Sequence, residues 1–225
     1  QLNIPWGTSA PAKKEVNSVG KQNGYRWKQW FIFGYDSAGN DSDEVYSYHG
    51  SGYNKHNTTN TPSARSGGAS CLFNGNIIYF GGKTYNDTYE LNLTTYAWSQ
   101  ISITGADIPT GRRRMGYTNS SSKLYIFGGI NASNNKLNDL WELDLSTNSW
   151  SVLDDGSSTT YSILKPEERA GAALYFYENR LYLHGGDGVS GVKQDMWYFD
   201  LTSNTWWKLK LSETTPKLYL ANTTI

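Results

Sequence analysis

The fold is decided by Leu124-Tyr-Ile-Phe-Gly-Gly129, which is followed by Asn138-Asp-Leu-Trp-Glu-Leu-Asp144 and then by Trp150. Two further copies keep the same order of residues. They are Leu181-Tyr-Leu-His-Gly-Gly186, Gln194-Asp-Met-Trp-Tyr-Phe-Asp200 and Trp206, and Ile77-Ile-Tyr-Phe-Gly-Gly82, Asn86-Asp-Thr-Tyr-Glu-Leu-Asn92 and Trp98. The acid of the second segment precedes the late Trp by 11 residues in every copy. A fixed interval inside a unit of about 50 residues is typical of a repeat architecture.

Each copy is predicted to contain four short strands. The run 123–127 is apolar and rich in β-formers, and it ends at a Gly pair that permits positive φ. Residues 139–144 alternate polar and apolar side chains, as a half-buried strand does, and Trp150 opens one more strand. The innermost strand is expected to begin at an Arg-x-Gly motif, at Arg65, Arg114 and Arg169. Four strands per unit without helical periodicity predict the blades of a propeller.

These motifs resemble the kelch-repeat family. The Arg-x-Gly start, the Gly pair, the acid-x-aromatic strand and the late Trp cover residues 65–206. The resemblance implies a β-propeller, usually of about five to seven blades. We therefore expect an all-β fold, a kelch-type β-propeller of four-stranded blades that forms a single domain over residues 1–225.

A fourth, degenerate copy lies upstream. Trp30-Phe-Ile-Phe-Gly-Tyr35 takes the place of the Gly-pair strand, with Tyr35 in the position of the second Gly, and Glu44-Val-Tyr-Ser-Tyr48 takes the place of the acidic strand. About four blades are thus expected. Their predicted boundaries are 15–64, 65–112, 113–168 and 169–210, with partial blades at 1–14 and 211–225.

Two explanations of the partial blades remain open. Strands from both ends of the chain can complete one shared blade, or the chain is a window onto a longer propeller. The second explanation is favoured, because an open propeller edge exposes unpaired strand groups that natural sheets avoid.

Composition excludes several classes of function. The chain carries 20 basic and 20 acidic residues without a long run of either sign, so a nucleic-acid interface is not expected. No stretch reaches the roughly 18 apolar residues that a membrane span needs. Aromatic residues make up 15% of the chain, and we expect most of them to fill the space between blades.

No catalytic or metal site is expected from these residues. The resemblance to galactose oxidase, which has a kelch-type propeller, raises the alternative of a copper radical oxidase or another carbohydrate-active enzyme. The only thiol is Cys71, in a predicted inner strand, and the three His are His49, His56 and His184. His184 replaces the Phe of the sister repeats and is interpreted as a packing residue. We therefore predict that the protein has no cofactor. A glycan-binding propeller is a further alternative for its function.

The favoured function is a non-catalytic scaffold that presents its loops to a protein partner. The framework repeats, whereas the loops after the Gly pair differ in length, and variable loops on a rigid scaffold commonly carry recognition. Arg112 and Arg113 are interpreted as extra residues, outside the repeat, and as candidate anchors. The complete set of candidate partner-binding residues is Arg112, Arg113, Tyr85, Asn134, Lys136 and Lys193.

Seven Asn-x-Ser/Thr sequons raise the question of compartment. Asn119 and Asn131 are expected in polar turns, where an attached glycan projects into solvent. A secreted or cell-surface protein is slightly favoured over a cytoplasmic or cytoskeletal one, and a mass change on deglycosylation of native material tests this expectation.

Overall fold

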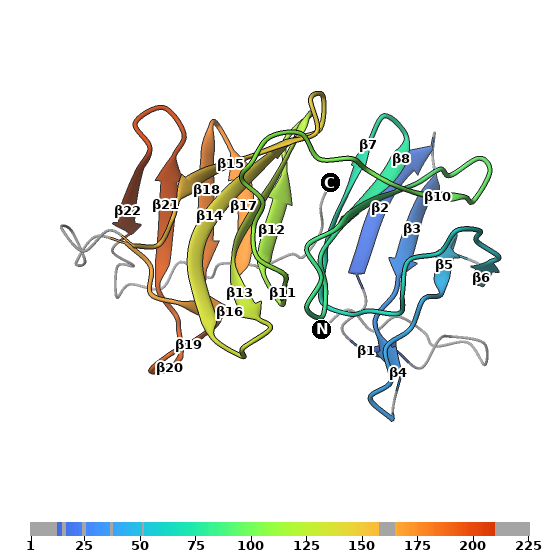
Figure 1. Ribbon diagram of the computed structural model, residues 1–225, viewed down its shortest axis with the longest axis horizontal. Helices are drawn as coiled ribbons and strands as arrows, with labels where there is room; N and C mark the ends of the chain where they lie inside the picture. The colour runs from blue at the N-terminus through green and yellow to red at the C-terminus, as the bar shows by residue number, and fades with distance from the viewer. Residues whose placement is uncertain are drawn as a thin grey trace.

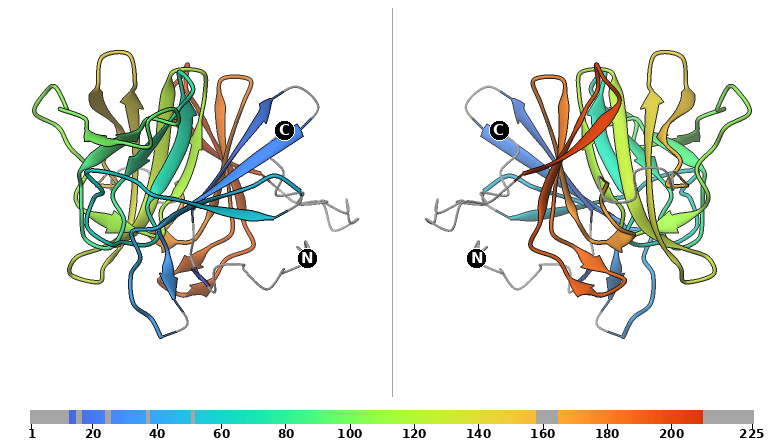
Figure 2. Two further views of the ribbon diagram at one scale, coloured as in Figure 1. Left: turned by 90° about the vertical axis from the view of Figure 1, so that its right-hand side faces the viewer. Right: turned by 90° about the vertical axis from the view of Figure 1, so that its left-hand side faces the viewer.

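The computed structural model describes residues 13–14, 17–23, 26–36, 38–50, 52–157 and 165–209, and these ranges contain strands and turns without a helix. The predicted partial blade at 211–225 and almost all of the one at 1–14 lie outside the described residues. Four antiparallel sheets stand side by side, with β6 and β22 at the two ends of the row in Figure 1. Figure 2 shows these sheets splayed from one another when viewed from either side.

Each sheet is one repeat of four sequential strands, and we number the sheets blades 1 to 4 in chain order. Blade 1 consists of β2 (Asn17–Asn23), β3 (Arg26–Ile32), β5 (Val45–Tyr48) and β6 (Tyr53–His56). Blade 2 consists of β7 (Ala69–Phe73), β8 (Asn76–Phe80), β9 (Thr88–Leu91) and β10 (Trp98–Gln100). Blade 3 consists of β12 (Gly116–Asn119), β13 (Lys123–Asn131), β14 (Lys136–Asp144) and β15 (Ser149–Asp154). Blade 4 consists of β17 (Ala173–Tyr177), β18 (Arg180–His184), β21 (Met196–Asp200) and β22 (Thr205–Leu209). The prediction of an all-β propeller with sequential four-stranded blades is confirmed.

Short additional strands mark the entry to three blades. They are β1 (Lys13–Lys14), which pairs with β4 (Tyr35–Asp36), then β11 (Arg112–Arg113), which pairs with β13, and β16 (Arg169–Ala170), which pairs with β19 (Asp187–Gly188) and through it with β20 (Gly191–Val192). Each innermost strand contacts the innermost strand of the next blade. The entry strands therefore lie close to the line along which the blades meet.

Three hydrophobic clusters hold the four blades together, one between each neighbouring pair. In β13, Leu124 and Ile126 pack toward blade 2, whereas Tyr125 and Phe127 pack toward blade 4. Both faces of this strand are buried because period-two alternation sends successive side chains to opposite faces. The late Trp of each repeat joins these clusters, as Trp98, Trp150 and Trp206 show.

A buried arginine side chain connects separate segments of the chain within each of blades 2 to 4. Arg112 has no solvent exposure, and its guanidinium donates to both carboxylate oxygens of Asp139 at 2.6 and 2.7 Å. It also donates to the carbonyl oxygens of Thr110 at 3.0 Å and of Gly128 at 3.1 Å. The same four contacts recur for Arg65 with Ser63, Gly81 and Asp87, and for Arg169 with Glu167, Gly185 and Asp195.

This pattern corrects the interpretation of the three consecutive arginines. Arg112, not Arg114, corresponds to Arg65 and Arg169, so the arginine of the repeat stands two residues earlier than predicted and Arg112 is part of the framework. A Pro stands three residues before the framework Arg in each case, at Pro62, Pro109 and Pro166, and all three are buried. That spacing was available in the sequence and identifies the correct arginine.

The recurring polar side chains of each blade have two different roles. The framework arginine binds within its own blade, and Asp139 and Asp195 accept its buried guanidinium. Asp144 and Asp200 accept turn amides, from Ser146 and Thr202 respectively.

The degenerate blade 1 keeps the second Gly of the pair and has lost the first, the reverse of the prediction. Phe33 has φ +58°, in line with +68° at Gly81, and Gly34 has φ +105°, in line with +85° at Gly82. The amides of Gly34 and Gly82 donate to Arg65 and Arg112, the framework arginines of the following blades. Phe33 accepts the left-handed backbone because its ring fills the interface between blades, 5.1 Å from the ring of Trp98.

Blade 4 buries only one of its two faces within the described residues. Leu181 and Leu183 have no exposure and pack on blade 3. Tyr182 and His184, the counterparts of the buried Tyr125 and Phe127, are only half-buried. His184 was interpreted as a packing residue, and it occupies the slot of Phe127 on a face that no described sheet covers.

The framework arginine predicts a sharp contrast between adjacent residues. Arg112→Ala should lower the free energy of unfolding by about 3–5 kcal/mol, because it leaves the Asp139 carboxylate and the Gly128 carbonyl without their buried donor. Arg113→Ala should change it by less than about 0.5 kcal/mol, since that side chain is partly exposed. Chemical denaturation of the two variants measures the contrast, and equal losses would contradict the assignment of Arg112 to the framework.

Candidate interaction face

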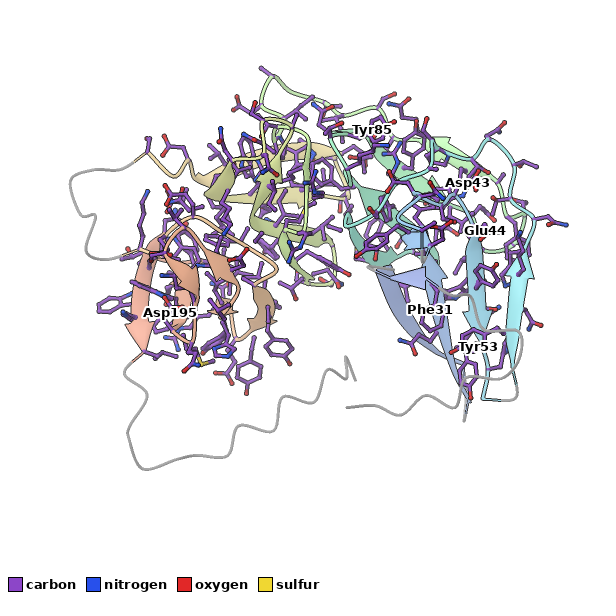
Figure 3. All side chains as sticks on the ribbon, turned by 90° about the horizontal axis from the view of Figure 1, so that it is seen from below. Phe31, Asp43, Glu44, Tyr53, Tyr85 and Asp195 are labelled. Atoms are coloured by element: carbon purple, nitrogen blue, oxygen red, sulfur yellow. The ribbon has the colours of Figure 1, made fainter. Side chains whose placement is uncertain are left out.

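The turns after the Gly pairs of all four blades lie on one side of the molecule, which we call the loop face. It comprises residues 35–36, 38–44, 83–87, 130–138 and 187–195. In Figure 1 this is the lower side, where β4, the tip between β13 and β14, and the hairpin β19–β20 lie. Figure 3 views the molecule from this side, with Tyr85 and Asp195 labelled. These loops therefore share one face of the fold (Figure 1).

Ion pairs connect the loop of one blade to that of its neighbour. Lys83 Nζ of blade 2 lies 2.9 Å from Asp41 Oδ2 of blade 1. Lys136 Nζ of blade 3 lies 2.9 Å from Asp187 Oδ1 of blade 4 and donates to the Gly188 carbonyl at 2.7 Å. The hydrogen bond with Asp41 raises the pKa of Lys83. The loops thus form one continuous surface with defined contacts between blades.

The structure distributes the six predicted partner-binding residues unevenly. Arg112 is fully buried, so the prediction that it anchors a partner is wrong. Arg113 and Asn134 come together, with Arg113 Nη2 donating to Asn134 Oδ1 at 3.3 Å. Tyr85 lies under the Arg65 guanidinium, whose carbon is 4.1 Å from the ring centroid.

The remaining two candidates are lysines that already have partners. Lys136 joins blades 3 and 4, as described above. Lys193 Nζ lies 2.6 Å from Glu167 Oε1 and donates to the Ser190 hydroxyl at 2.5 Å. The hydrogen bond from Lys193 lowers the pKa of Glu167. Partner binding by Arg113, Tyr85, Asn134, Lys136 and Lys193 stays a prediction.

The sequence reasoning missed the apolar tip of the loop face. Val189 is 69% exposed and Val192 is 81% exposed, and both lie in the hairpin β19–β20. The hairpin is held on both sides, by Lys136 through Asp187 and by Lys193 through Ser190. Two valines in an otherwise polar, Gly-rich loop are a signal that the sequence did contain.

Arg114 occupies a special backbone position where blades 2, 3 and 4 meet. Its φ is +55°, and the equivalent residues of the neighbouring blades are Gly67 at +68° and Gly171 at +66°. The Arg114 amide donates to the Gly67 carbonyl at 2.7 Å, and the Gly171 amide donates to the Arg114 carbonyl at 2.7 Å. Backbone hydrogen bonds therefore run from blade to blade through three left-handed residues, one of which carries a long side chain.

The residues weighed for copper are not brought together in the described part of the chain. Cys71 is buried in the cluster between blades 2 and 3, and burial raises the pKa of its thiol to about 12. His56 of blade 1 packs against Trp30 of the same blade and Tyr96 of blade 2, and His184 lies in blade 4. Among the described residues no three His, Cys, Asp or Glu side chains are grouped as a metal site. The absence of a cofactor stays a prediction.

The two candidate glycosylation sites differ in their surroundings. Asn119 is exposed at the end of β12, and its side-chain amide donates to the Ser120 carbonyl at 3.0 Å. The Asn131 side-chain oxygen accepts the amides of Ser133 and Asn135, which shapes the turn after the Gly pair. Neither side chain is in a core cluster, and glycosylation at both stays a prediction. The described residues hold no helix of the length and apolarity that crossing a membrane requires.

The repeat geometry agrees with a comparison against known families. The profile described as the KLHDC2/KLHL20/DRC7 Kelch-repeats domain matches residues 86–222, more than half of the chain. The chain belongs to the kelch-repeat family. Similar proteins include human host cell factor 1, 32% identical over 64% of this chain, and mouse kelch domain-containing protein 10, 28% identical over 66%. Tip elongation aberrant protein 1 of Schizosaccharomyces pombe is 33% identical over 62%.

The matched region is a small part of these relatives. It spans 8% of host cell factor 1, 35% of kelch domain-containing protein 10 and 13% of tip elongation aberrant protein 1. The likeness therefore identifies the kelch repeats as the shared unit, and the activities of the longer proteins belong to those proteins.

Backbone strain at the kelch Gly position predicts opposite effects at neighbouring residues. Arg114→Gly should be more stable than Arg114→Ala by about 1 kcal/mol, because both variants lose the side chain but only Gly adopts positive φ without a steric cost. At Arg113, which lies in β11, Gly should instead be less stable than Ala by about 0.5–1 kcal/mol. Thermal and chemical unfolding of the four variants measure both differences, and the same order at both positions would contradict the assignment.

Proposed function

We propose that this chain is a non-catalytic interaction module whose loop face binds another protein. The observation that carries the proposal is the exposed pair Val189 and Val192 on a hairpin that neighbouring ion pairs hold in place. An apolar tip with a polar rim is the usual composition of an interface centre. Because the hairpin is already ordered, binding costs little additional conformational entropy.

The charges around the tip indicate the kind of surface that it fits. Lys136 lies at its base, and Arg113 and the exposed Arg114 lie on the adjoining entry to blade 3. Arg is favoured at interfaces because its planar guanidinium contacts carboxylates and aromatic rings. A partner segment with apolar side chains next to acidic ones would complement both features.

The competing enzyme and glycan-binding hypotheses draw no specific support from the described residues. Asp41, Asp187 and Asp195 on the loop face, and Glu167 outside it, are each bound by a lysine or an arginine. Stoichiometric copper in the purified protein would overturn the preference for a non-catalytic module.

Substitution of the tip tests the proposal directly. Val189→Ser combined with Val192→Ser should reduce the capture of specific partners at least about tenfold, because the loss of buried apolar area weakens binding. Quantitative mass spectrometry after affinity purification from the native source measures the loss. The melting temperature should stay unchanged, since both side chains are exposed in the free protein.

The matched control is Val152→Ser. Val152 is 41% exposed on the outermost strand β15, away from the loop face, so its replacement should leave the captured proteins unchanged. Equal recovery of every partner by the tip variant and the control would contradict the proposal.

A further inference from the structure

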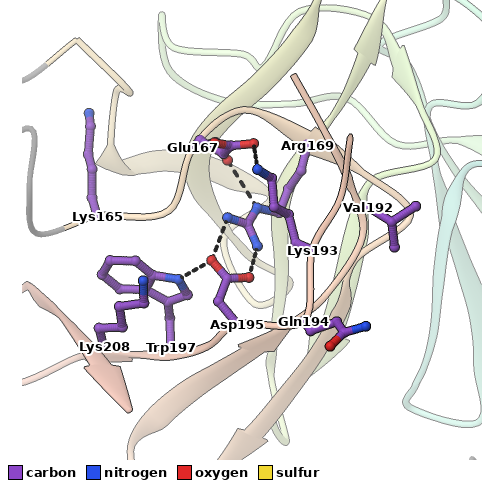
Figure 4. A pocket seen from close by; sticks show the side chains of 9 residues that line it. All are labelled: Lys165, Glu167, Arg169, Val192, Lys193, Gln194, Asp195, Trp197 and Lys208. Carbon is purple, nitrogen blue, oxygen red and sulfur yellow. Dashed lines mark hydrogen bonds and ion pairs between the residues drawn. The ribbon is translucent and has the colours of Figure 1, made fainter. Parts of the chain in front are cut away.

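A polar pocket lies where the connection into blade 4 crosses the strands of that blade. Its volume is about 540 Å³. Figure 4 shows its lining residues, which are Lys165, Glu167, Arg169, Val192, Lys193, Gln194, Asp195, Trp197 and Lys208. Pockets of about 300–1,000 Å³ are of the size that binds small molecules.

Both carboxylates of the pocket already have strong partners. Asp195 accepts from Arg169 at 2.6 and 3.0 Å and from the Trp197 indole nitrogen at 2.7 Å. Burial alone raises the pKa of Asp195, but the hydrogen bonds from Arg169 and Trp197 outweigh it and the pKa is lowered. Glu167 is bound by Lys193, as described above. These acids therefore stay ionised and are not free to neutralise further cations.

Two ammonium groups of the pocket lack such partners. Lys165 Nζ is buried and makes no hydrogen bond, and its nearest carboxylate oxygen, in Asp154, is 3.7 Å away. The other oxygen of Asp154 accepts from the Trp206 indole nitrogen at 2.9 Å. Lys208 Nζ lies 5.3 Å from the centroid of the Trp197 ring and has no hydrogen bond or ion pair to a described residue. A buried ammonium without an acceptor is costly, and this marks a place for an incoming oxygen.

The charge of the lining favours an anion. Lys165, Arg169, Lys193 and Lys208 contribute four positive charges, and Glu167 and Asp195 contribute two negative ones, which leaves a net charge of +2. Asp154, which stands behind Lys165, reduces it to +1. Lys165 has only the long ion pair with Asp154, and Lys208 has no ion pair with a described residue, so these two lysines carry the surplus.

The two lysines are not part of the repeated framework. Counted from the aligned proline, Lys165 corresponds to Ile108 in blade 3 and to Thr61 in blade 2. Counted from the late Trp, Lys208 corresponds to Val152 in blade 3. Blade 3 thus folds with apolar residues at both positions, and the lysines are a local feature of blade 4.

We propose that this pocket binds an oxyanion, either a phosphate or a carboxylate, between Lys165 and Lys208. Oxyanion oxygens would provide Lys165 with the hydrogen-bond acceptor that it lacks, and charge-assisted bonds of this kind are about twice as strong as neutral ones. The Trp197 ring offers an apolar wall for the group that carries the anion. Val192 of the valine tip also lines the pocket, but the anion is bound by Lys165 and Lys208, so the proposal holds whether or not the loop face binds a protein.

Nuclear magnetic resonance titration tests the proposal with inorganic phosphate, N-acetyl-phosphoserine amide and N-acetyl-aspartate amide as probes. The indole N–H signal of Trp197, assigned with Trp197→Phe, should shift and saturate in the millimolar range with at least one oxyanion. Sodium chloride at matched ionic strength should not reproduce the shift. A stronger effect of the two phosphates assigns the pocket to phosphate, and a stronger effect of the aspartate derivative assigns it to carboxylate.

The matched variant is Lys165→Ile combined with Lys208→Val, which copies blade 3. It should fold with an unchanged melting temperature and should lose at least about tenfold in affinity for the oxyanion. Single replacements by Gln, at Lys165 or at Lys208, provide a second test that keeps the polarity of the pocket. A shift that chloride reproduces, the absence of a saturable shift with every probe, or unchanged affinity in the double variant and both Gln variants would each overturn the proposal.

Discussion

The bidentate pairing of a buried arginine with an aspartate is the interaction on which each complete blade depends. The guanidinium binds the residue two positions before it, the first Gly of the pair and the Asp that opens the third strand. One side chain therefore fixes the entry strand, the turn after the second strand and the start of the third. Because removal of one partner from a buried pair leaves an uncompensated charge, the three segments are coupled far more tightly than a surface ion pair could achieve. The backbone of the same arginine accepts the second Gly amide of the preceding blade, as Arg65 does for Gly34, so the joint also connects neighbouring repeats.

The architecture could be predicted from the sequence because the same pattern of residues occurs in several copies. Alternation in 139–144, the Gly pairs and the constant interval to Trp150 each report local backbone geometry, and agreement among three copies removes most of the ambiguity. The register of the arginines could not be obtained from the Arg-x-Gly motif, because Arg114 stands where the other blades have Gly. A non-Gly residue at positive φ is uncommon, so the sequence alone did not place Arg114 at the Gly position. The Arg-x-Gly motif was therefore aligned on Arg114, two residues after the arginine that the tertiary hydrogen bonds identify. The spacing from Pro109 to Arg112 identifies the correct arginine. Proline is the better marker of the repeat because its ring fixes its φ, whereas arginine has no such constraint.

The candidate site was less predictable for a related reason. Residue type and loop position suggested that Arg112, Lys136 and Lys193 were available to a partner, yet each of them has an acidic or carbonyl partner in the fold. Pairing of this kind joins residues far apart in the chain, such as Lys136 with Asp187, and no local pattern reports it. Exposure of Val189 and Val192 likewise depends on a hairpin that projects from the blade. Loop length was informative because an insertion after the Gly pair leaves the framework contacts unchanged while it alters the face.

The repeated framework and the variable loops are thus separate parts of every repeat. The unequal burial of the last described blade shows how the repeats support one another. Tyr125 and Phe127 are buried because blade 4 covers them, whereas Tyr182 and His184 have no described blade on their side. In a repeat array most stabilisation comes from such nearest-neighbour interfaces, so a terminal unit is expected to unfold at lower cost than an internal one. The pocket with Lys165 and Lys208 lies on blade 4, next to the hairpin that carries the valine tip. An anion bound there would bridge the entry segment and the outer strand of blade 4, and it would stabilise a blade that has a single neighbour among the described residues.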